Sequence, residues 1–243
     1  MTTKILAALL LCALVACGKQ ETPRASDSAE RSPSPVRERG SGGEAGSGGE
    51  ARVVFFGTSL TAGLGVDPEE AYPALIQQRF DSLALEVEVV NAGVSGETSA
   101  AGLRRIDWLL RQPVAVLVLE LGANDALRGL ALKAAKENLQ EIINRARAKY
   151  PRVQIVVAGM QAPPNLGRRY TEEFSRMFVD LARENKAALI PFLLEGVGGN
   201  PELNQADGTH PTPEGHKLVA ENVWNVLARV MPEIQEREEE EKP

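Results

Sequence analysis

The sequence is poor in cysteine and histidine, and its N-terminal apolar run is too short to cross a membrane. Its 243 residues include two cysteines, Cys12 and Cys17, and two histidines, His210 and His216. Because no cysteine follows Cys17, the rest of the chain forms neither an internal disulfide nor a thiolate metal site. If a histidine acts as general base, it is either His210 or His216. The apolar run at 5–16 is shorter than the ~20 residues that span a bilayer.

The chain also lacks an excess of basic residues. It has 27 Lys and Arg against 33 Asp and Glu, which gives a formal net charge of −6. Because no basic stripe or patch is visible along the sequence, we expect no nucleic-acid partner. The sequence also indicates no cofactor, no metal ion and no obligate protein partner. We therefore expect its chemistry to depend on side chains and backbone groups alone.

The first residues have the features of a targeting segment. Lys4 precedes the apolar run, which is the arrangement of a secretory signal peptide. The run ends in Leu-Val-Ala-Cys17, which resembles the bacterial lipobox, where a cysteine is lipidated and becomes the mature N-terminus. We expect a lipoprotein signal peptide at 1–16 and a membrane anchor on Cys17; a plain secretory signal is the alternative. Gly18 favours the periplasmic face of the outer membrane of a bacterial cell envelope over the inner membrane.

Both ends of the remaining chain are poor in large apolar residues. Residues 17–51 are rich in Ser, Pro, Gly and Glu, and the hexapeptide Gly-Ser-Gly-Gly-Glu-Ala occurs twice in tandem at 40–51. Such a composition buries too little apolar surface to offset the entropy of ordering, so we expect a disordered linker. The acidic residues 232–243 are expected to form a solvated, disordered tail. One compact domain is therefore predicted at 52–231.

The middle of the chain alternates short apolar runs with longer segments of helical periodicity. The apolar runs lack the polar alternation of half-exposed strands. This lack of alternation is typical of strands buried on both faces of a parallel sheet. The pattern predicts an α/β fold, a three-layer αβα sandwich with a five-stranded parallel sheet. The expected strands are 53–56, 87–91, 114–121, 154–159 and 188–192, and the expected helices are 71–84, 99–112, 131–149, 171–186 and 213–229.

Ligands of such sheets bind beyond the carboxyl ends of the strands, so we sought candidate site residues there. Ser59 follows the first strand on a glycine-flanked turn, where its hydroxyl is a candidate nucleophile; a helix N-cap is the alternative. Gly93 follows the second strand and offers its N–H to a ligand; a turn that needs a positive φ is the alternative. Asn124 follows the third strand and offers its amide to a developing oxyanion. The alternative is that Asn124 or Asp125 caps the next helix.

The acid–base pair is predicted near the end of the domain. Asp207 lies three residues before His210 on a loop rich in Gly and Pro. At this spacing the carboxylate can accept the Nδ1–H of the imidazole, which leaves Nε2 to deprotonate a serine. A loop or cap residue is the alternative for Asp207, and His216 is assigned a structural role at an exposed helix position. A nucleophile, oxyanion donors and an acid–base pair together are the set that acyl transfer requires.

These residues resemble the motifs of the SGNH, or GDSL-type, hydrolases, and most of all those of the arylesterase and multifunctional acyl-CoA thioesterase/lysophospholipase group. The matching blocks are 57–60, the segment around Gly93, 122–125 and 207–210, with a further loop at 159–170, and together they cover essentially all of 52–231. The resemblance implies a flavodoxin-like strand order and Ser59 as nucleophile, with Asp207 and His210. It also implies an oxyanion hole made by the N–H groups of Ser59 and Gly93 and the amide of Asn124.

The sequence departs from the family motif at one position, because the usual Gly-Asp-Ser-Leu has Thr58 in place of the aspartate. No member of the predicted triad is lost. We expect hydrolysis of carboxylic esters, in the manner of an arylesterase, thioesterase or lysophospholipase, through an acyl-enzyme at Ser59. The expected substrate is a small ester or a lipid. The alternatives are an acetylesterase that acts on envelope carbohydrate and a non-catalytic lipoprotein that binds an envelope partner.

Overall fold

The structure is a computed structural model that describes the backbone of residues 51–240 and the side chains of residues 51–232. The predicted signal peptide at 1–16, the predicted lipid anchor on Cys17 and the predicted linker up to residue 50 lie outside the described residues. The domain begins one residue earlier than expected, because Ala51 is already the first residue of β1 (Ala51–Gly57). Ala51 is buried there and pairs with Val87 of the neighbouring strand.

Five strands form one parallel sheet, as predicted. They are β1, β2 (Val87–Asn91), β3 (Val116–Glu120), β4 (Gln154–Ala158) and β5 (Ala188–Ile190). Their spatial order is β2-β1-β3-β4-β5, which is the flavodoxin-like order that the family resemblance implied. Every residue of β3 is buried, because helices cover both faces of a parallel sheet.

Helices connect the strands and cover both faces of the sheet. They are α1 (Ser59–Ala62), α2 (Tyr72–Ser82), α3 (Ser99–Leu109), α4 (Ala123–Leu127), α5 (Leu132–Lys149), α6 (Arg168–Glu184) and α7 (Pro213–Glu240), with 3₁₀ helices η1 (Pro68–Glu70) and η2 (Pro164–Leu166). In residues 51–240, no helix combines the length and apolar character that a membrane span requires.

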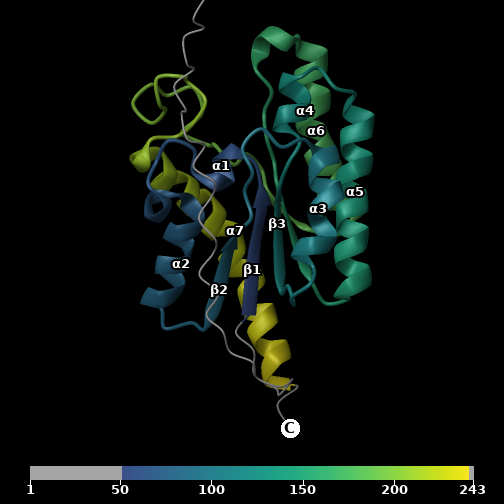
Figure 1. Cartoon of the computed structure of the whole chain (residues 1–243), viewed down its shortest axis with the longest axis vertical. Helices are drawn as coiled ribbons and strands as arrows, with labels where there is room; N and C mark the ends of the chain where they lie inside the picture. The colour runs from purple at the N-terminus through teal and green to yellow at the C-terminus, as the bar shows by residue number, and fades with distance from the viewer. Residues whose placement is uncertain (1–50, 241–243) are drawn as a thin grey trace, which may run out of the picture. The chain divides into compact units, whose positions relative to one another are not determined.

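The handedness of the crossovers sets which helix covers which face. The chain steps from β1 to β2 in one direction and from β2 through β3, β4 and β5 in the other. Because such crossovers are right-handed, the helix after β1 lies on one face, and the helices after β2, β3 and β4 lie on the other. Accordingly α2 packs with α7, whereas α3 packs with α5 and α5 with α6. Figure 1 shows these two groups on opposite sides of the central strands.

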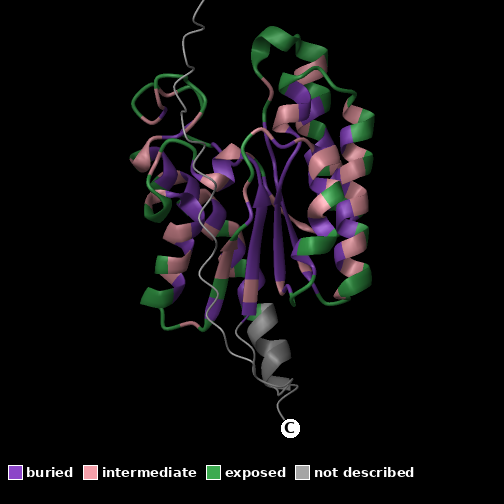
Figure 2. Ribbon diagram, in the orientation of Figure 1, coloured by how far each residue is buried: buried purple, intermediate pink, exposed green. Residues whose placement is uncertain are grey.

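The sheet forms the centre of a single continuous apolar core. Figure 2 shows the central strands buried along almost their whole length, while the helices are buried only on the faces that contact the sheet. Phe55 and Phe56 of β1 point to opposite faces, and both are fully buried. Each such side chain contributes about 1.5–3 kcal/mol of burial free energy. The chain needs no disulfide to hold this core together.

The end of the last helix differs from the sequence prediction. The helix expected at 213–229 is α7, and it continues through Pro232 to Glu240. A proline inside a helix removes one backbone hydrogen bond, but the Glu, Gln and Arg residues that follow are good helix formers. The tail predicted to be disordered from residue 232 is therefore helical as far as Glu240.

The direction of the chain reverses at β1, because β2 lies on one side of β1 and β3 on the other. Such a switch point opens a crevice beyond the carboxyl ends of these strands. The segments that follow β1, β2 and β3 carry Ser59, Gly93 and Asn124 respectively. The fold therefore brings these three predicted residues to one edge of the sheet.

Candidate active site

Ser59 is the first residue of α1, directly after the turn that ends β1. The N-cap of α1 is Thr58, so the alternative role of Ser59 as a helix cap is wrong. The turn needs a glycine at position 57, because a Cβ there would lie 2.0 Å from Thr61 Oγ1. The tight turn leaves the Ser59 hydroxyl free of its own helix and directs it to the loop that carries the predicted base.

Ser59, His210 and Asp207 form one continuous hydrogen-bond chain. The Nε2 of His210 lies 2.9 Å from Ser59 Oγ, and its Nδ1 lies 2.6 Å from Asp207 Oδ2. The three predicted residues thus meet, although Ser59 follows β1 and the other two lie in the loop before α7. With Nδ1–H donated to the carboxylate, Nε2 is an acceptor for the serine hydroxyl. This arrangement can activate Ser59 as a nucleophile.

The loop holds the Asp207 carboxylate in place by itself. Its Oδ1 accepts the backbone N–H groups of Thr209 at 2.8 Å and His210 at 3.0 Å, while Oδ2 faces the imidazole. Gly208 takes a positive φ of 69° between them, a conformation that glycine adopts without strain. The His210 backbone N–H, the His210 imidazole and the Thr209 N–H together lower the pKa of Asp207 to about 2. The carboxylate therefore stays ionised at neutral pH.

Asn124 lies in α4 with its side chain directed to the loop after β2. Its Nδ2 donates to the Glu97 carbonyl oxygen at 3.0 Å, and an amide has a second N–H to offer. Gly122 is the N-cap of α4, so the alternative that Asn124 or Asp125 caps the helix is wrong. Asp125 instead accepts two hydrogen bonds from Ser99 and so ties α4 to the start of α3.

Gly93 does not offer a free donor in this structure. Its N–H donates to Asn91 Oδ1 at 3.0 Å. Gly93 does not have a positive φ, so the alternative role, a turn that needs a positive φ, is wrong. The glycine is needed for close packing, because a Cβ would lie 2.3 Å from the backbone nitrogen of Ala62.

Gly96 is a residue of this loop that sequence reasoning missed. Within residues 51–240, neither the backbone N–H of Gly96 nor that of Ser59 donates a hydrogen bond. Gly96 has a φ of 76°, and its carbonyl accepts the Arg128 guanidinium at 2.7 Å. The next residue, Glu97, accepts the Asn124 amide, which keeps the Gly96–Glu97 segment beside Asn124. The repeated glycines of the segment Asn-Ala-Gly-Val-Ser-Gly at 91–96 were the available signal.

Comparison with known proteins identifies the family of the chain. Residues 55–218 match the model of the GDSL-like Lipase/Acylhydrolase family. The chain belongs to this family. It is 44% identical over 172 residues to Esterase TesA of Pseudomonas aeruginosa. These aligned residues cover 70% of this chain and 85% of that protein. The predicted family and fold are thus confirmed, and the chain is a carboxylic ester hydrolase.

Two further comparisons support the assignment. The chain is 37% identical over 171 residues to Thioesterase 1/protease 1/lysophospholipase L1 of Escherichia coli, covering 70% of this chain and 79% of that protein. A crystal structure of TesA superposes with a TM-score of 0.71 at 42% identity, over 74% of this chain and 99% of that one.

The second histidine of this hydrolase is buried, not exposed as expected from the sequence. His216 is 1% exposed in α7, and its Nδ1 accepts the Tyr72 N–H at 3.3 Å. Burial, with a smaller contribution from nearby His210, lowers the pKa of His216 to about 4. Its assigned structural role agrees with this position, because its ring packs parallel to that of Tyr72.

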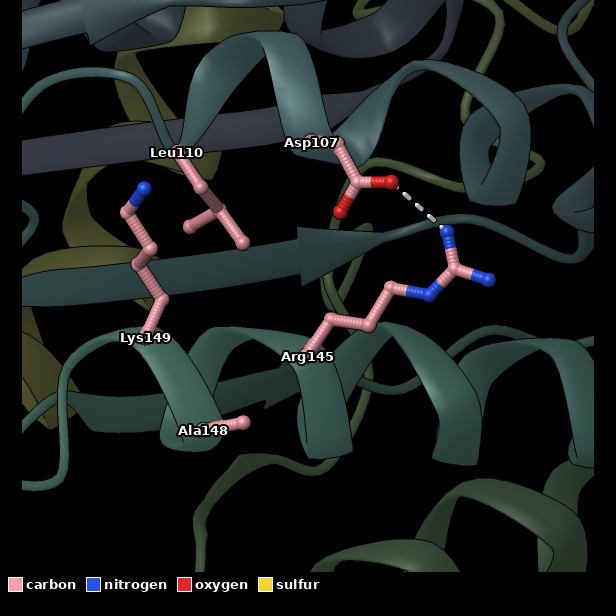
Figure 3. Close-up of a pocket in the computed structure, with 5 residues that line it drawn as sticks. All are labelled: Asp107, Leu110, Arg145, Ala148 and Lys149. Carbon is pink, nitrogen blue, oxygen red and sulfur yellow. Dashed lines mark hydrogen bonds and ion pairs between the residues drawn. The ribbon is translucent and has the colours of Figure 1, made fainter.

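A surface depression lies away from the hydrolase triad. It is lined by Asp107, Leu110, Arg145, Ala148 and Lys149, at the C-terminal ends of α3 and α5, and Arg145 pairs with Asp107 across it (Figure 3). Each of these helices leads into the next strand, so their C-terminal ends lie at the amino edge of the sheet. Ser59 lies at the carboxyl edge. The depression is therefore not part of the candidate active site.

Proposed function

We propose that this hydrolase cleaves acyl esters through a covalent acyl-enzyme on Ser59, with His210 as general base and Asp207 as its acidic partner. The observation that carries the proposal is the continuous hydrogen-bond chain Asp207–His210–Ser59, at 2.6 and 2.9 Å. Both distances lie within hydrogen-bond reach for acid–base catalysis. The lowered pKa of Asp207 keeps a negative charge beside the imidazolium that forms in the reaction.

The reaction has two half-reactions. Ser59 Oγ adds to the acyl carbon while His210 Nε2 takes the hydroxyl proton, and the bond to the leaving group then breaks as His210 returns that proton to it. A water molecule repeats the sequence on the acyl-enzyme. Its oxygen adds to the acyl carbon, its proton passes through His210 to Ser59 Oγ, and the carboxylic acid leaves.

The oxyanion that forms in each half-reaction needs donors that are free when the substrate arrives. The N–H of Ser59 and the second N–H of the Asn124 amide meet this requirement. A role for Gly93 requires its bond to Asn91 to break first. Gly96 requires no such rearrangement, and we therefore propose Gly96 as the third donor in place of Gly93. Preorganised donors of this kind are the largest electrostatic contribution to acyl transfer.

The loops around the triad favour an apolar acyl group. Exposed leucines occur in the segments that follow β1, β3 and β4, namely Leu64, Leu127 at the end of α4, Leu130, and Leu166 at the end of η2. These segments follow the carboxyl ends of their strands, on the same edge of the sheet as Ser59, and apolar side chains there match a hydrocarbon chain better than a hydrated sugar. The name of the Escherichia coli relative, a thioesterase and lysophospholipase, agrees with acyl-chain substrates. We therefore place medium or long acyl esters, thioesters and lysophospholipids ahead of acetylated carbohydrate.

A substrate panel tests this order. p-Nitrophenyl acetate, butyrate and octanoate share a leaving group and differ only in the acyl chain. We expect KM to fall as the chain lengthens, and lysophospholipid to be cleaved faster than an acetylated sugar. A preference for the acetylated sugar by orders of magnitude would transfer the assignment to a carbohydrate acetylesterase.

The triad itself is tested with Ser59→Ala. This variant removes only the hydroxyl, so we expect an unchanged melting temperature and loss of ester hydrolysis by about 10⁶-fold. A fluorophosphonate probe should label the wild-type protein and not the variant. A folded wild-type protein that is neither labelled nor active would instead support a non-catalytic binding lipoprotein.

We further propose that Cys17 carries a lipid and that the hydrolase is anchored on the periplasmic face of the outer membrane. The support is the order of sequence features: a charged residue, an apolar run, Leu-Val-Ala-Cys and a polar linker. In membrane fractionation, the wild-type protein should be in the outer-membrane fraction and Cys17→Ala should be released. Recovery of the wild-type protein with the soluble periplasmic proteins would contradict the anchor.

A further inference from the structure

A buried carboxyl group lies directly behind the turn that carries Ser59. Glu120, the last residue of β3, is fully buried and lies opposite Gly57 of β1 in the sheet register. Its Oε2 accepts the Thr58 backbone N–H at 2.7 Å and the Thr61 hydroxyl at 2.8 Å. Its Oε1 accepts the Thr58 hydroxyl at 3.0 Å. Within the described residues, no lysine, arginine or histidine forms an ion pair with Glu120.

The hydrogen bonds around Glu120 form a directed chain. Tyr72 OH lies 2.7 Å from Thr61 Oγ1. Because the Thr61 hydroxyl donates to Glu120, Tyr72 donates to Thr61. Burial and the nearby Glu120 raise the pKa of Tyr72 well above its usual value, so this hydroxyl keeps its proton. Glu120 thus connects β3 with the turn after β1, with α1 and with the start of α2.

Burying the carboxyl group of Glu120 costs free energy, so stabilising the fold does not explain its presence. Burial raises the pKa of Glu120, and the hydrogen bonds from Thr58 and Thr61 only partly oppose that effect. Moving an unpaired carboxylate out of water costs several kcal/mol, and an apolar side chain of similar volume would avoid that cost. A buried polar group with a full set of directed donors restricts geometry instead.

The geometry that Glu120 restricts is that of the peptide between Thr58 and Ser59. Thr58 is held from one side by two hydrogen bonds to Glu120, through its N–H and its hydroxyl. From the other side, its carbonyl oxygen accepts the Ala62 N–H at 2.9 Å. A trans peptide is planar, with its C=O and N–H pointing in opposite directions. The direction of the Ser59 N–H is therefore set once Thr58 is held.

We propose that Glu120 is a positioning residue for acyl transfer: it holds Thr58 so that the Ser59 N–H points at the oxyanion that forms on the substrate. The inference rests on the acyl-enzyme mechanism proposed above. It also gives a reason for the unusual Thr58. A threonine donates its hydroxyl to Glu120 at 3.0 Å, whereas an ionised aspartate at this position has no hydrogen to donate.

Two substitutions at position 120 test the proposal. Glu120→Gln keeps an oxygen that accepts the Thr58 N–H and has nearly the same shape, whereas Glu120→Leu keeps the volume and removes every acceptor. Active sites are counted by fluorophosphonate titration, so that only folded protein enters kcat. We expect Glu120→Gln to stay within about threefold of wild-type kcat. We expect Glu120→Leu to lose about 10–100-fold in kcat at an unchanged KM, because a small misplacement of a reacting group has effects of this size.

A tetrahedral analogue separates positioning from stability. A boronic acid that adds to Ser59 forms an oxyanion mimic, and its affinity should fall by the same factor as kcat in Glu120→Leu. The affinity of the carboxylic acid product should not change. Lower thermal stability with unchanged kcat and boronate affinity per titrated site would mean a purely structural role and would overturn the proposal. Equal losses in Glu120→Gln and Glu120→Leu would also overturn it, because charge and not geometry would then be decisive.

Substitutions of Thr58 provide a second pair of variants if Glu120→Leu does not fold. Thr58→Ser keeps the hydroxyl donor, and Thr58→Val has the same shape without it. We expect near wild-type kcat for the serine variant and a severalfold lower kcat with unchanged KM for the valine variant. Equal kcat values would overturn the proposal. These tests need only an active wild-type protein, so their failure is distinct from a failure of the acyl-enzyme mechanism, which Ser59→Ala reports.

Discussion

The side chain of Gln205 donates a hydrogen bond of 2.7 Å to the backbone carbonyl oxygen of Leu64. The same amide donates to the Pro211 carbonyl at 2.9 Å. Gln205 therefore ties the loop that carries Asp207 and His210 to the segment that follows Ser59. Gly65 makes room for this contact, because a Cβ there would lie 2.2 Å from Gln205 Oε1.

Replacing Gln205 should loosen the triad without removing any of its members. We expect Gln205→Leu, which has a similar volume and no donors, to lower kcat by about tenfold or more, because small displacements of a base have large effects. The rate of fluorophosphonate labelling should fall by a similar factor. Gln140→Leu, a matched change on α5 remote from the triad, is the control. A Gln205→Leu variant with wild-type kcat would show that the loop holds its position unaided.

Asp207→Asn should separate charge from shape in the acid partner. Asparagine can keep an oxygen for the N–H groups of Thr209 and His210, but it then presents an N–H to the imidazole and favours the wrong tautomer. We expect kcat to fall by about 10⁴-fold, the loss known for this change in catalytic triads. Circular dichroism and the melting temperature serve as controls for the fold. A loss below tenfold would mean that His210 acts without the carboxylate.

Asn124→Ala should remove one proposed oxyanion donor. The side chain also donates to the Glu97 carbonyl, so Asn124→Asp, which keeps the shape and removes both donors, is the matched variant. We expect both changes to lower kcat by about 10²–10³-fold at a nearly constant KM, because the donor acts mainly on the transition state. Steady-state kinetics on p-nitrophenyl butyrate measure the two parameters separately. A change confined to KM would place Asn124 in substrate binding instead.

His216 should make the fold sensitive to mild acid. Its pKa is about 4 in the folded protein and about 6.5 in an unfolded chain. Between these values the unfolded state binds a proton that the folded state does not, so stability falls as the pH decreases from 6.5 towards 4. At pH 5 the loss relative to pH 7 is about 2 kcal/mol.

Urea unfolding of the wild-type protein and of His216→Gln at pH 7 and pH 5 measures this loss as the difference between the two proteins, because the raised pKa of Glu120 acts in the opposite direction in both. His216→Gln lacks the titrating group and should show a smaller difference between the two pH values. Asp207 does not contribute in this window, because its lowered pKa of about 2 and the ordinary aspartate value both lie below pH 5. An equal pH dependence in the wild-type protein and His216→Gln would assign the effect to other groups.

Much of the fold was predictable because its signals are local. All five strands and the helices α2, α3, α5 and α6 lie within a few residues of their predicted positions. Buried strands have an apolar run, and helices have their own period, so neither requires knowledge of a distant partner. The end of α7 was not predictable in the same way, because a proline and a run of glutamates indicated a break where the helix continues.

The candidate site was predictable only in part. The Asp207–His210 spacing is local, and the structure brings this pair to Ser59 as expected. The donor role of Gly93 was less predictable, because its N–H is satisfied by the Asn91 side chain two residues earlier. Whether a backbone N–H is free depends on side-chain geometry, which composition and spacing do not contain.

The sequence by itself determined the order of strands and helices, the chemistry of the triad and the family of the chain. The order of the elements and the Asp207–His210 pair follow from residue types at short spacing, whereas the role of Ser59 and the family follow from motifs spread along the chain. Only the tertiary structure decided that Glu120 holds the Thr58 turn and that Gln205 ties the base loop to Leu64. These partners are 62 and 141 residues apart in the chain. Their contact depends on the register of the sheet and the packing of its loops, which no local pattern specifies.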